Sequence, residues 1–271
     1  RITYIGTTDT NYKAEIDEPS TTMEDAEYVL RAVNALFPSI NLTIDDVQST
    51  WAGLRPLIHE EGKSPSELSR KDEIFLSKTG LISMAGGKLT GYRKMAERAM
   101  DQAAQQLKKA TGQSIPDSTT KTIKLVGGRF ESQDALDQFA AKKVGEAKQI
   151  MAPAQQVVDL VYRYGSDTDV ILEKAFELYG SIKDPALRLL AAEIWYGIQY
   201  EMCHELNDFF IRRTGRLYFE RPSIPEILAF SADQMQLHLR WSDSEKVDQI
   251  QAFNKEFDLV MAFASDPVNS K

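Results

Sequence analysis

Two adjacent glycines followed by a lysine are the first residues whose types and order could do chemistry. Gly86 and Gly87 stand between a strand-like run and a helix-like run, and Lys88, Leu89 and Thr90 follow them. Glycine lets the backbone approach a ligand closely, and a helix start offers free N–H groups that suit an anion or an electron-rich ring oxygen. A lysine opposes the helix dipole at that end, which indicates a functional position. The same pattern also fits an ordinary strand-to-helix turn, and it is not a P-loop because the GxxxxGK[ST] frame is absent.

Two arginines form a second group that could bind an anion. Arg55 lies in an otherwise apolar stretch, and a buried arginine needs a carboxylate or phosphate partner for its planar fork. Arg70 lies further along the chain, in a polar run. With Lys88, the two arginines are what a site for a dianionic phosphate requires. Taken alone, Arg70 fits better as the partner of a nearby carboxylate, and spacing does not establish that the three cations converge.

A small polar turn after the first strand-like run is a third candidate. Thr7 and Asp9 supply a hydroxyl and a carboxylate that could contact a cofactor. By pattern they fit better as a turn held by side-chain hydrogen bonds to the backbone.

Several kinds of site are excluded by the remaining polar residues. His59, His204 and His238 share no motif spacing, and no HExxH or CxxC pattern occurs, so we predict no metal site. Cys203 is the single cysteine, which excludes an internal disulfide and fits a reducing compartment. No GxGxxG fingerprint of a dinucleotide-binding fold occurs in the chain.

The composition is that of an ordinary globular protein. The 271 residues are 42% hydrophobic and 27% charged, which excludes a disordered or low-complexity chain. No apolar run approaches the ~18 residues that a membrane-spanning helix needs. The net charge of −8 lacks the basic footprint expected of a nucleic-acid-binding protein.

Residues 1–116 alternate strand-like and helix-like patterns, which predicts an α/β or α+β segment. Thr21 and Glu24 have the spacing of a capping box at the start of the first helix. The predicted helices are 21–37 and 90–107, and the predicted strands are 2–5, 47–58, 72–78 and 81–85.

Residues 117–271 predict an all-helical domain after one short strand at 121–126, with the domain boundary near Pro116. Asp184 before Pro185, and Ser242 with Glu245, are helix-start signals. The predicted helices are 132–151, 154–164, 167–179, 185–214, 225–240 and 243–264.

The sequence begins at Arg1 inside a strand-like run, and its first residues do not have the pattern of a signal peptide. We therefore expect the C-terminal portion of a longer protein. A trimmed version of a complete domain is the alternative.

At these motifs the sequence resembles the C-terminal half of FAD-dependent (aerobic) glycerol-3-phosphate dehydrogenases and of the similar α-glycerophosphate oxidases. The order and separation of the motifs match that family. The sharpest are YIGTTD at 4–9, WAGLRPL at 51–57, and GGKLT at 86–90 followed by YRKMAE at 92–97; weaker ones are RYG at 163–165 and DFFIRRT at 208–214.

The resemblance implies a D-amino-acid-oxidase-like flavoenzyme fold, followed by a helical C-terminal domain. It implies oxidation of sn-glycerol 3-phosphate to dihydroxyacetone phosphate, with a hydride passing from C2 of the substrate to N5 of FAD. Lys88 matches a catalytic and substrate-binding position, and Arg55 and Arg70 match positions on the substrate phosphate. The implied cofactor-binding residues are Thr7, Asp9, Gly86, Gly87, Leu89 and Thr90.

The family carries its FAD-binding GxGxxG fold in a first half that this chain lacks. We therefore expect the isolated chain to bind FAD poorly and not to turn over. The resemblance covers both dehydrogenases and oxidases; class frequency alone favours quinone as electron acceptor, and oxygen with release of hydrogen peroxide is the alternative. The alternative to an enzyme is a binding protein, in which the helical domain is a non-catalytic docking module. We expect a cytoplasmic location; peripheral association with the inner face of the cell membrane, and a homodimer, stay open.

Overall fold

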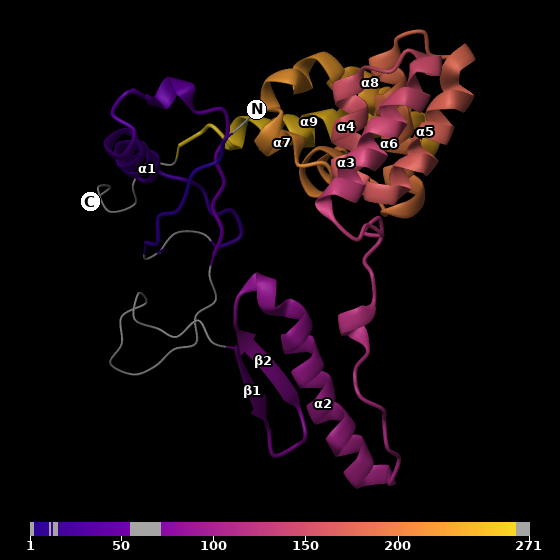
Figure 1. Ribbon diagram of the computed structural model, residues 1–271. Coiled ribbons are helices and arrows are strands. Elements are labelled where there is room, and N and C mark those ends of the chain that lie inside the picture. The colour runs from indigo at the N-terminus through magenta and orange to yellow at the C-terminus, as the bar shows by residue number, and fades with distance from the viewer. Residues whose placement is uncertain (1–2, 11, 13–15, 55–71, 264–271) are drawn as a thin grey trace. The chain divides into compact units, whose positions relative to one another are not determined.

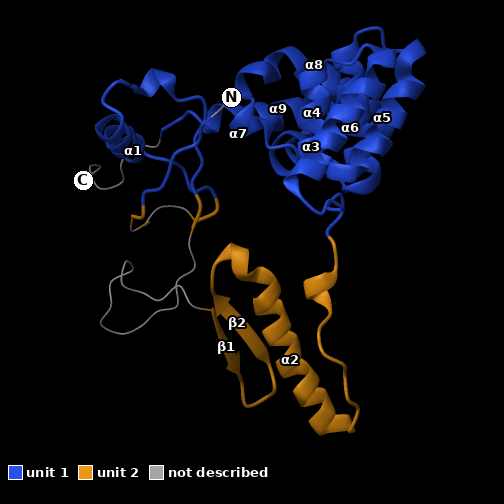
Figure 2. Cartoon of the chain, viewed as in Figure 1, with its two compact units in different colours: residues 1–8, 18–52, 125–271 blue, residues 9–17, 53–124 orange. Residues whose placement is uncertain are grey.

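The computed structural model describes residues 3–10, 12, 16–54 and 72–263, and the chain divides into two compact units (Figure 1 and Figure 2). Unit 1 comprises residues 1–8, 18–52 and 125–271, and unit 2 comprises residues 9–17 and 53–124.

Unit 2 is built on a β-hairpin. Strands β1 (Asp72–Leu76) and β2 (Ile82–Gly86) pair antiparallel, with Ile74 opposite Met84. Gly80 closes the turn with φ +89°, a conformation that glycine adopts without a steric penalty. The strands predicted at 72–78 and 81–85 are therefore found, and they pair as a hairpin.

A long helix follows the hairpin in unit 2 (Figure 1). Helix α2 (Tyr92–Thr111) begins after a 3-10 turn at Leu89–Gly91 and ends at Gly112, which has a left-handed conformation. Arg98 on the helix forms an ion pair with Asp72 on β1. The helix thus lies along the face of the hairpin that carries Asp72.

The apolar side chains of unit 2 are largely exposed. No residue of α2 is buried, and the Leu89 side chain next to the helix is 89% exposed. Other exposed apolar residues of this unit include Phe75, Leu76, Leu81, Tyr92, Met100 and Leu107. The described part of unit 2 therefore buries little hydrophobic surface of its own.

Unit 1 is helical. In its helical part α3 packs on α4, and α6 packs on both α5 and α8. One core cluster includes Phe209, Phe210 and Phe253, and a second includes Ile171 and Leu189. None of the described helices combines the length and the hydropathy that a membrane-spanning segment requires. The helices of the unit are α1 (Met23–Leu36), α3 (Gln133–Ala147), α4 (Ala154–Tyr164), α5 (Thr168–Glu177), α6 (Pro185–Tyr200), α7 (Arg216–Phe219), α8 (Ile224–Leu239) and α9 (Asp243–Leu259).

Local capping explains where these helices begin. Asp184 accepts hydrogen bonds from the first N–H groups of α6, and Ser242 forms a capping box with Glu245 at α9, as predicted. At α1 the capping box is formed by Thr22 and Asp25, one residue later than predicted. The Asp25 carboxylate accepts a hydrogen bond from the Thr22 N–H, and the Thr22 hydroxyl oxygen accepts one from the Asp25 N–H.

The single long helix predicted over 185–214 is wrong. Helix α6 ends at Tyr200, because Met202 takes a left-handed φ of +54° and the Cys203 N–H donates back to the Gly197 carbonyl at 3.0 Å. The chain then resumes as a π-helix at Asp208–Arg213. Cys203 and His204 therefore lie in a connection, which corrects the prediction that they lie on a helix.

Three predicted strands are not found where the structure describes the chain. Residues 3–5, 47–54 and 121–126 contain no strand. A strand needs a hydrogen-bonded neighbour, and in the described residues these segments have none with which to form a ladder. Residues 120–122 form a 3-10 turn instead.

The buried arginine of α6 binds backbone rather than a carboxylate. The Arg188 guanidinium donates to the carbonyl oxygens of Ile150 (2.7 Å), Ile182 (2.9 Å) and Lys183 (3.1 Å). Ile150 ends the 3-10 turn after α3, and Ile182 follows the end of α5. One side chain therefore binds the carbonyl groups that two helix ends leave unsatisfied.

Candidate functional site

The segment between β2 and α2 turns sharply at its two glycines. Gly86 pairs with Asp72 at the end of the strand ladder, and Gly86 and Gly87 have φ values of +73° and +86°. Lys88 is extended, and its carbonyl oxygen accepts from the Gly91 N–H at 2.8 Å. Only glycine adopts two successive left-handed conformations readily, so the chain needs this residue type here.

Gly87 also permits a close contact with α2. A Cβ atom on Gly87 would lie 2.6 Å from the sulfur of Met95 and 3.1 Å from the Cβ atom of Asp72. The residue therefore has a packing role besides the role in ligand approach that the sequence suggested.

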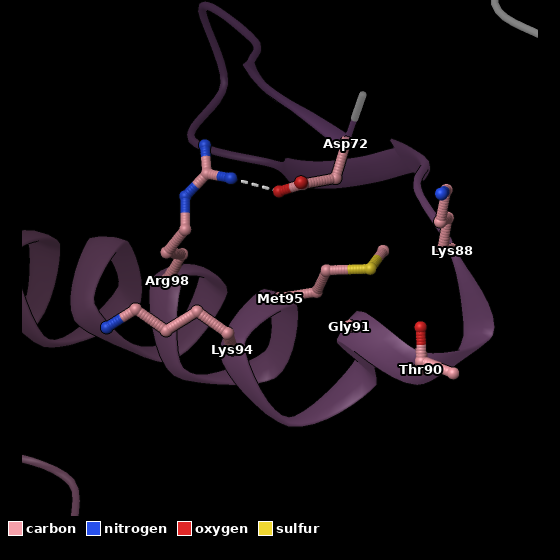
Figure 3. Close-up of a pocket in the computed structure, with 7 residues that line it drawn as sticks. All are labelled: Asp72, Lys88, Thr90, Gly91, Lys94, Met95 and Arg98. Carbon is pink, nitrogen blue, oxygen red and sulfur yellow. Dashed lines mark hydrogen bonds and ion pairs between the residues drawn. The ribbon is translucent and has the colours of Figure 1, made fainter. Parts of the chain in front are cut away.

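A shallow hollow opens beside this turn, within unit 2 (Figure 3). Its volume is ≈ 390 Å³, and it is open to solvent. Three cations and one carboxylate contribute to its wall, and the carboxylate of Asp72 is already paired with Arg98. The lining residues are Asp72, Lys88, Thr90, Gly91, Lys94, Met95 and Arg98.

Helix α2 begins with cations rather than carboxylates. Gly91 at its N-cap offers no side-chain acceptor, and the first turn contains no acidic residue. Lys94 and Arg93 both bind Glu97, and these hydrogen bonds lower the pKa of the Glu97 carboxyl group. Within the described part of the chain, the Lys88 ammonium group has no hydrogen-bond or ion-pair partner. The hollow therefore offers an uncompensated positive charge next to a helix N-terminus, which suits an anion.

The predicted site residues are distributed unevenly. The hollow contains Lys88 and Thr90, with Leu89 in the same turn. Thr7 belongs to unit 1 and Asp9 to unit 2, and both side chains are exposed. Their part in cofactor binding stays a prediction. Arg55 and Arg70 lie outside the described residues, so their convergence with Lys88 also stays a prediction.

Sequence reasoning missed the three other charged residues of the hollow. Lys94 and Arg98 are four residues apart on α2 and so share one helix face, and Asp72 opens the strand that pairs with Gly86. The spacing of the two cations was a signal that could have been read.

Sequence reasoning also missed a buried ion-pair network in the helical unit. Glu193 in α6 is 1% exposed and accepts hydrogen bonds from Arg163, from the Tyr164 hydroxyl (3.1 Å) and from Arg216 (2.6 Å). Arg163 also donates to Glu220 at 3.0 Å. Burial acts to raise the pKa of Glu193, but Arg216 and Arg163 outweigh it and hold that pKa below its ordinary value. The available signal was the position of Glu193 within an apolar run of the predicted helix, which indicates a buried carboxylate that needs a cationic partner.

Two families match successive parts of the chain. Residues 1–93 match the family of FAD dependent oxidoreductases, and residues 118–246 match the family described as the C-terminal domain of alpha-glycerophosphate oxidase. The second match covers most of the helical segment from α3 into α9.

Similar proteins carry both parts. The aerobic glycerol-3-phosphate dehydrogenase of Bacillus subtilis is 40% identical over 258 residues, which cover 93% of this chain and 46% of that protein. The enzyme of the same name from Staphylococcus aureus (strain USA300) is 41% identical over 254 residues, covering 93% of this chain and 44% of that protein. The X-ray structure of the glycerol-3-phosphate dehydrogenase from Bacillus halodurans complexed with FAD is 38% identical, with a TM-score of 0.80 over 96% of this chain and 50% of that one.

The chain thus spans about half the length of these relatives. Its two family matches lie in the same order as the predicted α/β segment and helical domain, which confirms the predicted fold class. On these grounds the chain belongs to the family of FAD-dependent glycerol-3-phosphate dehydrogenases and α-glycerophosphate oxidases.

Proposed function

We propose that this chain is the C-terminal portion of a flavoenzyme that oxidises sn-glycerol 3-phosphate to dihydroxyacetone phosphate. The observation that carries the proposal is the Lys88 turn, since an unpartnered ammonium group stands in a cationic hollow at the start of α2. The names of the relatives, and the FAD in the Bacillus halodurans structure, support the same activity.

The residues of the turn fit FAD in their charge. FAD supplies the acceptor for the hydride, and its reduced ring is anionic or electron-rich. Helix α2 presents N–H groups with no side-chain cap and no acidic residue in the first turn, which favours negative charge near Leu89 and Thr90. The contribution of this chain would be to stabilise that charge.

Lys88 would act on the substrate by its charge. Its ammonium group donates up to three hydrogen bonds, and no described side chain competes for them. It would bind the substrate oxygens and hold the glycerol backbone for transfer of the C2 hydride. Arg55 and Arg70 would bind the substrate phosphate, for which paired guanidinium groups supply bidentate geometry.

The electron acceptor separates two forms of this activity. The dehydrogenase names of the relatives favour quinone, whereas the family that matches residues 118–246 takes its name from an oxidase, which favours oxygen. Oxygen consumption with an equal amount of hydrogen peroxide, in the assembled flavoenzyme, would decide for the oxidase. Peripheral membrane association and a homodimer are further parts of the proposal.

The visible absorption spectrum tests the proposal. Since the chain has no GxGxxG fingerprint, we expect the purified chain to be colourless. Combined with an FAD-binding half from a relative, it should form a yellow complex whose flavin bands bleach when sn-glycerol 3-phosphate is added. A flavin-loaded complex that does not bleach with this substrate would overturn the proposal.

A further inference from the structure

The Gly87 backbone lies between the hairpin of unit 2 and helix α2. A Cβ atom at this position would lie 2.6 Å from the sulfur and 2.8 Å from the methyl carbon of Met95, and 3.1 Å from the Cβ atom of Asp72. Only a residue without a side chain fits between these two neighbours. Figure 3 shows the Met95 side chain extending from α2 toward the turn that carries Lys88. Met95 and Asp72 therefore both lie against the residue that precedes Lys88.

Asp72 also joins the hairpin to the helix. It is paired with Gly86 across the strand ladder, and its carboxylate forms an ion pair with Arg98, three residues after Met95 on α2. Residues three apart share one face of a helix, so Met95 and Arg98 face the hairpin together. The ion pair therefore keeps the face of α2 that carries Met95 against the turn.

The Lys88 backbone is held on its other side by the start of the helix. Its carbonyl oxygen accepts a hydrogen bond from the Gly91 N–H at 2.8 Å, and the Leu89 carbonyl oxygen accepts one from the Tyr92 N–H. Gly87 on one side and this 3-10 turn on the other therefore fix where the Lys88 side chain begins. Since that side chain is a flexible four-carbon stem, the place of its backbone decides which positions the ammonium group can reach.

The carboxylates near Lys88 are already engaged with other cations. Asp72 lines the same hollow as Lys88, and it is paired with Arg98. Glu97 on α2 is paired with Lys94. Among the residues that the structure describes, none takes the Lys88 ammonium group as a hydrogen-bond or ion-pair partner. The pairing of Asp72 with Arg98 therefore leaves Lys88 available to an external anion.

We infer that Met95 is a positioning residue for Lys88. The Met95 side chain supports Gly87, Gly87 fixes where the Lys88 side chain begins, and Lys88 presents its charge to the substrate oxygens. A charge that stabilises a transition state must be closely placed, and a displacement of about 1 Å costs up to about 10²-fold in rate. This inference rests on the proposed function, in which Lys88 binds those oxygens.

Kinetics of the complex with an FAD-binding half test the inference. Met95→Ala removes the sulfur and the methyl group that support Gly87. We expect kcat for sn-glycerol 3-phosphate, per bound flavin, to fall about tenfold and KM to stay within about twofold, because the displaced charge acts in the transition state. A merely structural effect would reduce the amount of flavin-loaded complex and leave kcat per flavin unchanged. Met95→Leu has nearly the same volume and should restore kcat. An unchanged kcat per flavin in Met95→Ala would overturn the inference.

The matched control is another methionine of the same helix. Met100 is 62% exposed and does not line the hollow, whereas Met95 is half-buried and lines it. Met100→Ala removes the same atoms from α2, so it should leave kcat and KM unchanged. A fall of kcat in Met100→Ala as large as in Met95→Ala would mean that any such change in α2 has this effect, and it would overturn the inference.

A double-mutant cycle shows whether Met95 acts through Lys88. Single-turnover bleaching of the flavin bands measures the slow variants that lack the lysine. In the Lys88→Ala background we expect Met95→Ala to have no further effect on the rate, because the group that it positions is absent. A further fall of about tenfold would mean that the two residues act independently, and it would overturn the inference.

Hydrogen exchange in the 271-residue chain tests the support of the turn without substrate or flavin. The Gly91 amide reports on the turn, because it donates to the Lys88 carbonyl oxygen. We expect this amide to exchange about tenfold faster in Met95→Ala than in wild type or Met100→Ala, while unchanged amides in β1 confirm that the hairpin is folded. Equal exchange of the Gly91 amide in all three would overturn the inference. Absence of substrate-dependent bleaching in the wild-type complex would instead overturn the proposed function, while the Gly91 amide would still decide whether Met95 supports the turn.

Discussion

A Cβ atom on Gly165 would lie 2.1 Å from the carbonyl oxygen of Gly127, because the two backbones are in direct contact where α4 ends. The Ser166 N–H donates to the same carbonyl oxygen at 3.0 Å. Gly165 and Gly127 have φ values of +57° and +74°. The segment before α3 is thereby bound to the end of α4, and neither position has room for a side chain.

Substitution of Gly165 should therefore destabilise the helical unit. We expect Gly165→Ala to lower the free energy of unfolding by about 2–4 kcal/mol, from backbone strain together with overlap. Urea unfolding followed by circular dichroism measures this. The control is Gly145→Ala within α3, where no atom lies within 4 Å of the new Cβ and stability should rise by about 0.5–1 kcal/mol. Equal midpoints for the two variants would show that the backbone contact does not exist.

Removal of the buried carboxylate of α6 should be costly. Glu193→Ala leaves Arg163 and Arg216 without their shared partner, and we expect a loss of about 3–5 kcal/mol in the free energy of unfolding. The comparison is Glu27→Ala at the exposed Arg31–Glu27 pair, where the change should stay below about 1 kcal/mol. A small effect of Glu193→Ala in the same unfolding assay would mean that water reaches the network.

The same carboxylate should make stability depend on pH. The pKa of Glu193 is lower in the folded state than the value of about 4.3 expected when unfolded. Its contribution is therefore present above about pH 4.3 and is lost as the pH falls through the lower folded pKa. Glu193→Gln lacks this contribution, so its free energy of unfolding should fall less steeply than that of wild type below about pH 4.3. If the free energy of unfolding of wild type and of Glu193→Gln fell in parallel below about pH 4.3, this assignment would be contradicted.

The single thiol should be inert in the folded chain. Burial raises the pKa of Cys203 to about 12, so the thiolate is scarce at neutral pH. We expect no reaction with a thiol-specific disulfide reagent at pH 7 on the timescale of minutes, and stoichiometric reaction in urea. Rapid labelling of the native chain would show that the connection between α6 and the π-helix is open.

Lys88 should matter far more than another lysine of the same unit. In the complex with an FAD-binding half, Lys88→Ala should lower kcat/KM for sn-glycerol 3-phosphate by about 10²–10³, as loss of a charge that faces the developing transition state implies. Lys78, exposed in the hairpin turn, is the control, and Lys78→Ala should leave kcat/KM unchanged. Equal rates in the two variants would remove Lys88 from the site.

Helices with local start and stop signals could be predicted from the sequence. Capping at Asp184 and Ser242 depends on neighbouring residues, so their spacing sufficed. The end of α6 could not be predicted, because it depends on the left-handed turn at Met202 and on a backbone hydrogen bond to Gly197. Of the strands expected at 2–5 and 47–58, the described residues 3–5 and 47–54 form none, because an extended pattern does not specify its partner.

The candidate site was predictable in part. The pair Gly86 and Gly87 marked the turn, because successive left-handed residues require glycine. That Lys94 and Arg98 share the hollow with Lys88 depends on how α2 packs on the hairpin, which spacing alone does not supply. The domain boundary near Pro116, and the roles of Thr7, Asp9, Arg55 and Arg70, stay predictions.

Arg188 has a consequence for how the helical unit opens. Its guanidinium group binds carbonyl groups that follow α3 and α5, while its backbone belongs to α6. If the chain opened locally at one of these helix ends, the buried guanidinium group would lose a hydrogen-bond acceptor, which is costly for a charged group. The three helices are thereby coupled into one cooperative unit, which favours loss of their hydrogen-exchange protection in a single event rather than helix by helix. A lysine at this position would keep the charge but not the planar fork that reaches three acceptors at once.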